Sequence, residues 1–171
     1  MSAEIAAWFT GRLPSDWLAG EPAVTIDRDE VVVVLPIAVP EPPSNGGEAA
    51  AASATAGRIS RFREETREQR MRIAQEAEHR FDRKVSWGVQ CGDRKALFTT
   101  VSTPVMTRLR QPERTVLDTL VDAGVARSRS DALAWCVRLV RDHTEDWLGE
   151  LREALREVER LREAGPAAAA S

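Results

Sequence analysis

The feature that most constrains the fold of this chain is a turn, GVARSRSD at residues 124–131, between two segments of helical apolar spacing. The first segment, residues 111–123, begins with a proline suited to the first helical position and stops at Gly124. After the turn, Ser128 and Asp131 have the S-x-x-D spacing in which a side chain caps the start of a helix. The sequence therefore predicts two successive helices joined by a short, capped turn.

The second of these helices carries a long apolar stripe. We expect it to run for about thirty residues, until Gly165-Pro166 ends it. A lone helix cannot cover such a stripe, so it needs either a second chain, as in a coiled coil, or the charged helix predicted at residues 58–84. The residues that continue the stripe at nearly heptad spacing are Leu133, Val137, Val140, Thr144, Trp147, Leu151, Leu155 and Val158.

Two β-hairpins are predicted upstream of the helices. Residues 23–38 contain two β-rich runs around a polar turn, and residues 85–103 contain two more around Cys-Gly-Asp-Arg. Gly92 can supply the positive φ that the second turn needs, and the two hairpins could share one sheet. The aromatic residues expected to pack on the first hairpin are Trp8, Phe9 and Trp17.

The segment between the hairpins changes composition halfway. Residues 39–57 are mostly Pro, Ser, Gly and Ala, which predicts a flexible linker whose alanines could let the next helix start early. Residues 58–84 predict one long charged helix whose basic side chains could contact phosphates, although interleaved glutamates favour a solvated, self-paired face. Its narrow apolar stripe consists of Ile59, Phe62, Thr66, Ile73, Ala77 and Phe81.

Three motifs occur together in residues 105–141. They are the strand-like VMTRLR, the apolar pair Leu109 and Leu117, and the turn GVARSRSDAL. Together they resemble the ribbon-helix-helix family of small dimeric DNA-binding proteins. The resemblance implies a homodimer whose paired strands enter the major groove of double-stranded DNA, while the second helices start near the DNA backbone.

The resemblance also indicates which side chains would meet DNA. Alternation along the strand puts every second residue on the outer face, where Arg108 could bind a guanine edge bidentately and Met106 could make apolar contact. The start of the second helix offers unpaired N–H groups and the positive end of a dipole, which suit a phosphate. The predicted DNA-binding residues are Met106, Arg108, Arg110, Ser128, Arg129 and Ser130.

The charge distribution agrees with a polyanion partner for the middle of the chain. The formal net charge is -3, but residues 58–84 and 101–141 are net basic, whereas both ends of the chain are acidic. No apolar run is long enough to span a bilayer and the start lacks a signal-peptide pattern, so we predict a cytoplasmic protein without membrane contact.

The sequence gives little support for catalysis. It has no Gly-rich phosphate loop or nucleophile motif, and its two cysteines and two histidines lack metal-ligand spacing, so we predict no enzyme activity, metal or cofactor. The cysteines are expected to be reduced, although a disulfide between them stays open. Under the alternative of an enzyme, the candidate reactive residue is the thiol of Cys91, because the following Arg94 and Lys95 could lower its pKa.

These observations predict an α+β protein, with β-hairpins packed with long helices and a C-terminal ribbon-helix-helix-like unit with an extended last helix. We predict a dimeric DNA-binding protein that regulates transcription. The alternative is an adaptor that uses the same fold to dimerise and to bind a protein partner, without DNA. The expected segments are a helix and hairpin (1–38), a flexible linker (39–57), a long charged helix (58–84), a hairpin (85–103), the ribbon-helix-helix-like unit (104–165) and a disordered tail (166–171).

Overall fold

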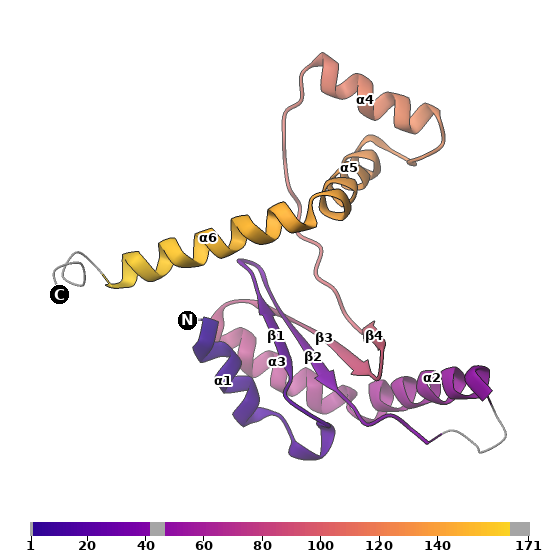
Figure 1. The fold of residues 1–171 in the computed structure, drawn as a ribbon, viewed down its shortest axis with the longest axis vertical. Coiled ribbons are helices and arrows are strands. Elements are labelled where there is room, and N and C mark those ends of the chain that lie inside the picture. The colour runs from indigo at the N-terminus through magenta and orange to yellow at the C-terminus, as the bar shows by residue number, and fades with distance from the viewer. Residues whose placement is uncertain (1, 42–46, 165–171) are drawn as a thin grey trace. The chain divides into compact units, whose positions relative to one another are not determined.

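The structure, a computed structural model, describes residues 2–41 and 47–164 and has the predicted α+β class. These residues form six α-helices, one 3-10 helix (η1, Ser15–Trp17) and one four-stranded sheet (Figure 1). The chain divides into two compact units, Met1–Val105 and Met106–Ser171, called here the N-terminal and C-terminal units. None of the helices within the described ranges has the length and apolar character to cross a membrane.

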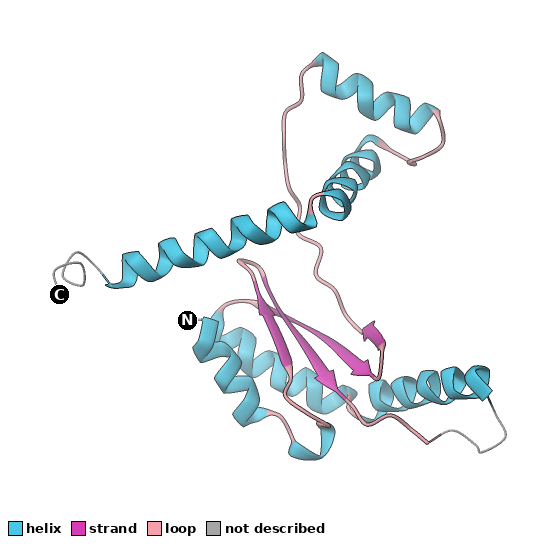
Figure 2. Cartoon of the chain, viewed as in Figure 1, coloured by secondary structure: helices cyan, strands magenta, loops and turns pink. Residues whose placement is uncertain are grey.

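The sheet of the N-terminal unit joins two hairpins (Figure 2). Strands β1 (Ala23–Ile26) and β2 (Glu30–Pro36) form the first, and β3 (Lys84–Cys91) and β4 (Arg94–Leu97) form the second, both antiparallel. Strands β2 and β3 lie side by side and parallel, so the strand order is β1-β2-β3-β4. Both predicted hairpins therefore form, and they share one sheet.

Local chemistry explains where the two hairpins turn. In the first, the Asp27 carboxylate accepts the backbone N–H groups of Asp29 and Glu30, at 2.8 and 2.7 Å, which closes the turn through the side chain. In the second, Gly92 has a φ of 58°, a left-handed conformation that glycine adopts at little cost.

A parallel pair of strands requires a crossover, and here two helices provide it. They are α2 (Gly47–Glu65) and α3 (Arg67–Phe81), which replace the single helix predicted over residues 58–84. The helix breaks at Thr66, where the hydroxyl donates to the carbonyl oxygen of Phe62 at 2.6 Å, a bond of the kind that bends helices.

The predicted linker at residues 39–57 is shorter than expected, because the next helix starts early, as its alanines allow. Helix α2 begins at Gly47, because the run of alanines after it has the highest helix propensity of any residue type. Residues 42–46, and the tail predicted at 166–171, lie outside the described residues.

The hydrophobic core of the N-terminal unit lies on one face of the sheet. Alternate residues of β2 and β3 point into it, and helices α1 (Ser2–Arg12), α2 and α3 cover it. As predicted, the aromatic residues Phe9 and Trp17 belong to this core, with Trp8 partly buried beside it, and most of the apolar stripe of residues 58–84 also packs here. The least exposed core residues are Ile5, Phe9, Val31, Val33, Leu35, Ile73, Ala77, Val89 and Cys91.

The C-terminal unit consists of α4 (Gln111–Asp122), α5 (Arg129–His143) and α6 (Glu145–Ala164). The predicted helix of about thirty residues is thus two helices. They break at Thr144, which has a φ of -130° and a ψ of 28° and whose hydroxyl donates to the carbonyl oxygen of Val140. The small core of this unit contains three buried residues, Leu117, Ala126 and Ala132.

Candidate nucleic-acid interface

The predicted ribbon, residues 105–110, is a loop in this single chain and pairs with no described strand. Its outward side chains are open to solvent: Met106 is 99% exposed, and Arg108 and Arg110 are also exposed. Leu109 is instead partly buried against the small core of the C-terminal unit. Of the inward positions, Val105 (87%) and Thr107 are also exposed, so only Leu109, where the loop meets α4, is turned toward the core.

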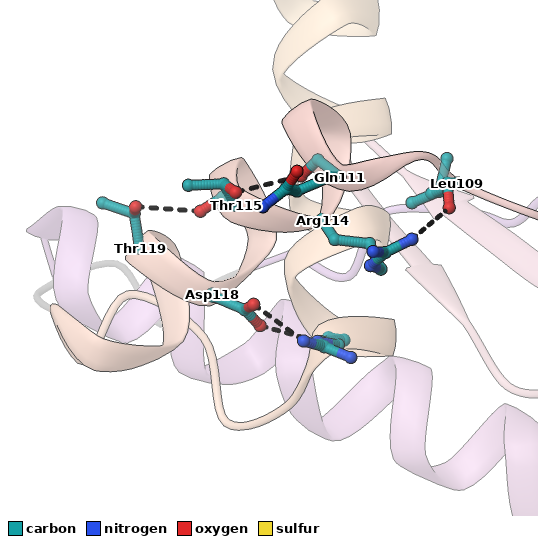
Figure 3. Close-up of polar contacts among 7 residues, drawn as sticks. Leu109, Gln111, Arg114, Thr115, Asp118 and Thr119 are labelled. Carbon is teal, nitrogen blue, oxygen red and sulfur yellow. Dashed lines mark hydrogen bonds and ion pairs between the residues drawn. The ribbon is translucent and has the colours of Figure 1, made fainter.

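The end of this loop is tied to the first turns of α4. Arg110 is the residue that precedes the helix, and Pro112 lies in the first turn, as predicted. The Arg114 guanidinium donates to the carbonyl oxygen of Leu109 at 2.8 Å (Figure 3). This hydrogen bond holds the backbone just after Arg108 against the helix, so the loop enters α4 with a defined direction.

The turn between α4 and α5 is built as the sequence indicates. Gly124 has a φ of 73°, and the N–H groups of Val125 and Ala126 both donate to the carbonyl oxygen of Leu120. Ala126 then enters the small core, where it is 7% exposed. Because a side chain at Gly124 would be strained in this conformation, glycine is needed here.

The predicted cap of α5 is present. The hydroxyl of Ser128 accepts the N–H of Asp131 at 3.2 Å, and the Asp131 carboxylate accepts the N–H of Arg127 at 3.1 Å. The second bond, together with the Arg127 side chain, holds the pKa of Asp131 below its usual value. Ser130 lies exposed in the first turn of the helix.

Arg129 has a partner that sequence reasoning missed. Its guanidinium binds both carboxylate oxygens of Asp118, on α4, at 2.6 and 2.7 Å (Figure 3). The same hydrogen bonds hold the pKa of Asp118 below its usual value. A phosphate would have to compete with Asp118 for this side chain. No sequence periodicity links the two residues, because they face each other only after the chain has turned.

The predicted DNA-binding residues form two groups within one chain. Ser128, Arg129 and Ser130 are adjacent at the start of α5, and the outward residues of the loop lie before the start of α4. Helix α4 lies between the two groups along the chain, and Arg129 reaches back to Asp118, two turns after the first residue of α4.

The basic side chains of α2 and α3 differ from the predicted self-paired face. Among the described residues, Arg61 and Glu65 form the one ion pair within these helices, at 3.8 Å. Glu76 instead binds Arg12 of α1 at 2.6 Å. Most charged side chains of the two helices therefore either pair with a residue outside α2 and α3 or have no ion-pair partner among the described residues.

Other sites for catalysis or metal binding gain no geometric support. Burial raises the pKa of the Cys91 thiol, the opposite of the shift considered from the sequence. Both cysteines are free thiols. Within the described ranges, no three His, Cys, Asp or Glu side chains gather as a metal ion would require.

Comparison with known proteins divides the chain at about the same place as the structure does. Residues 3–97 match the N-terminal domain of Rv1265-like proteins, and residues 110–162 match the Mb1296 C-terminal domain. The chain is 58% identical over 161 residues to the uncharacterized proteins Mb1296 of Mycobacterium bovis and Rv1265 of Mycobacterium tuberculosis. Each match covers 94% of this chain and 70% of the relative. No solved structure matches the chain.

Proposed function

The chain belongs to the Rv1265-like family, and we propose that it is a dimeric DNA-binding protein that regulates transcription through a C-terminal unit of the ribbon-helix-helix kind. In the proposed dimer, residues 105–110 of two chains pair as an antiparallel ribbon that enters the major groove. Within residues 2–41 and 47–164 of one chain the ribbon has no partner strand, so the function depends on dimerisation.

The observation that carries this proposal is that the C-terminal unit buries few apolar side chains and leaves others exposed. Three residues are buried there, whereas apolar side chains of α4 and α5 lie open to solvent. Val137 and Val140 lie one turn apart on α5, and a contiguous apolar patch marks an interaction site in soluble proteins. The exposed side chains and their exposed fractions are Val116 (55%), Val125 (48%), Val137 (63%), Leu139 (41%) and Val140 (51%).

The charges of the unit favour DNA as the ligand of the dimer. Arg108 and Arg110 are exposed, and no carboxylate of the described residues lies within ion-pair distance of either. An unpaired guanidinium can donate two parallel hydrogen bonds to a guanine edge. The first N–H groups of α5, beside Ser130, are available to a backbone phosphate.

Binding to a mixed pool of double-stranded DNA, followed by fluorescence anisotropy at two salt concentrations, tests the proposal. We expect the affinity to fall steeply with salt, and the double variant Arg108→Ala/Arg110→Ala to lower both the affinity and the salt slope. The matched control is Arg156→Ala/Arg160→Ala on α6, which removes the same charge from two exposed ion pairs. Absence of binding at low salt, or an equal loss in the control, would contradict the proposal.

A second candidate function, the protein-binding adaptor, is favoured by one observation on α6. A groove of about 510 Å³ lies between α5 and α6, and its walls are mostly apolar. Truncation of the chain after Thr144 separates the two functions, because it removes α6 and the acidic charge that α6 carries. If α6 regulates DNA binding, the truncated chain should still dimerise and should bind DNA more tightly. The exposed apolar residues of α6 are Trp147, Leu151, Leu155, Val158 and Leu161.

A further inference from the structure

A pocket of about 260 Å³ lies in the N-terminal unit, at the edge of the sheet. Strand β4 pairs with residues 88–91 of β3, so among the described residues no strand covers the edge of β3 before Gly88. The chain after β4 borders the pocket instead: the hydroxyl of Thr99 accepts the backbone N–H of Trp87 at 2.9 Å. Helices α2 and α3 form the opposite wall.

Three arginines line this pocket, and no acidic residue does. Arg67 and Arg70 lie one turn apart on α3, and Arg63 lies at the end of α2, across the break at Thr66. In the described ranges none of them has a carboxylate partner, whereas Arg61, on another face, binds Glu65. The pocket therefore concentrates positive charge that the protein itself does not neutralise.

Hydrogen bonds and stacking fix the position of the Arg70 side chain, as is usual for a residue that binds a ligand. Its side chain is 5% exposed, its Nε donates to the Thr66 hydroxyl at 2.9 Å, and one terminal nitrogen donates to the carbonyl oxygen of Arg63 at 2.7 Å. The guanidinium stacks over the Phe98 ring at 4.8 Å. A guanidinium has five N–H groups, so donors remain for a ligand.

The environment of Arg70 also favours an anion. Burial, with repulsion from Arg63 and Arg67, lowers the pKa of Arg70 to about 10. A bound anion would remove this penalty, because it supplies the opposite charge that a buried cation requires.

Trp87 supplies an independent observation. It lines the pocket and is 3% exposed, and its indole Nε1 has no hydrogen-bond partner among the described residues. A buried donor without a partner costs about 1–3 kcal/mol, so such groups are uncommon in native proteins. Because the same residue lines the pocket, its indole N–H resonance can report on a ligand bound there.

We propose that this pocket binds a small phosphorylated organic metabolite. The phosphate contacts the guanidinium groups of Arg63, Arg67 and Arg70, and the organic part lies against Phe98 and the indole ring of Trp87. Three cations suit a dianionic phosphate better than a singly charged carboxylate. The volume is just below the usual range of ligand pockets, which limits the ligand to a small molecule.

A recessed site of this kind does not suit the backbone of a DNA duplex. The 5% exposure of Arg70 leaves it below the surface that a convex duplex could touch. The pocket lies wholly within the N-terminal unit, and the inference does not depend on DNA binding by the C-terminal unit.

The test is titration of the full chain with phenyl phosphate, measured by calorimetry and by the indole N–H resonances in NMR spectra. We expect saturable binding that shifts one indole resonance, assigned to Trp87 by its absence from Trp87→Phe. Benzoate should bind at least tenfold more weakly, and phenol should not bind. Arg67→Gln should weaken the binding of phenyl phosphate at least tenfold, whereas Arg72→Gln, on α3 but outside the pocket lining, should leave it unchanged.

Several results would overturn the proposal. They are the absence of saturable binding, an unmoved Trp87 resonance, benzoate binding as tight as that of phenyl phosphate, or equal losses in the two arginine variants. Displacement of phenyl phosphate by a short DNA duplex would assign the arginines to DNA instead. Failure of the DNA-binding proposal leaves the phenyl phosphate result untouched, because Arg108 and Arg110 lie outside this pocket.

Discussion

Replacement of Val137 and Val140 by serine should weaken the proposed dimer without unfolding the C-terminal unit. The two side chains are 63% and 51% exposed in the single chain, so each has about half of its surface left to bury in a dimer. Full burial of a valine is worth roughly 2 kcal/mol, so half burial is worth about 1 kcal/mol, and four such side chains per dimer contribute about 4 kcal/mol. That loss corresponds to a roughly thousandfold rise in the dimer Kd.

Serine suits this test because valine and serine have similar helix propensities, so α5 itself should not weaken. Sedimentation velocity over a range of concentrations measures the Kd, and circular dichroism checks the helix content. Val39→Ser is the control, because Val39 is 56% exposed but lies in the N-terminal unit. A monomeric parent chain at micromolar concentration, or a double variant that dimerises as tightly as the parent, would refute the reasoning.

Three further predictions concern particular residues. Gly88→Ala should destabilise the N-terminal unit by about 1–3 kcal/mol, measured by urea unfolding, because overpacking is costly. A Cβ at this position would lie 2.7 Å from a side-chain carbon and 2.9 Å from a backbone oxygen of β4. An unchanged unfolding midpoint would contradict this contact. Ser128→Ala should lower stability by about 1 kcal/mol through loss of the cap, whereas Ser130→Ala, within the first turn, should have a smaller effect. The N–H of Arg127 lowers the pKa of Asp131, so this carboxylate stabilises the fold above its unfolded pKa, and that contribution should disappear as the pH falls through the folded pKa. Melting midpoints of the parent and Asp131→Asn should therefore converge in acid, and a constant difference would refute the linkage.

Short-range features of the C-terminal unit follow directly from the sequence. The S-x-x-D spacing predicts the cap at Ser128, and the glycine after an amphipathic run predicts the turn at Gly124; the structure has both. The break at Thr144 was not predicted, because the threonine falls within the heptad pattern. The helix breaks there through the hydrogen bond that the threonine hydroxyl donates to the backbone, which the pattern does not show. The pairing of the ribbon with a second chain stays a prediction.

In the N-terminal unit, too, the local features follow from the sequence and the long-range contacts do not. Alternation and turn residues predict the two hairpins, but no local pattern states that β2 and β3 pair in parallel, because that contact joins residues far apart in the chain. The candidate ligand pocket was missed for the same reason. The spacing of Arg63, Arg67 and Arg70 is visible in the sequence, but it looks the same as that of a solvated helix face.

The sequence by itself determined the α+β class, the positions of both hairpin turns, both ends of the helix before Gly124 and the start of the helix after it, because propensity, capping and periodicity act over a few residues. Only the tertiary structure decided that Arg70 is buried in a pocket that Trp87 also lines and that Arg129 binds Asp118. Burial and charge pairing depend on which segments meet across the fold, and packing of the whole chain sets those meetings.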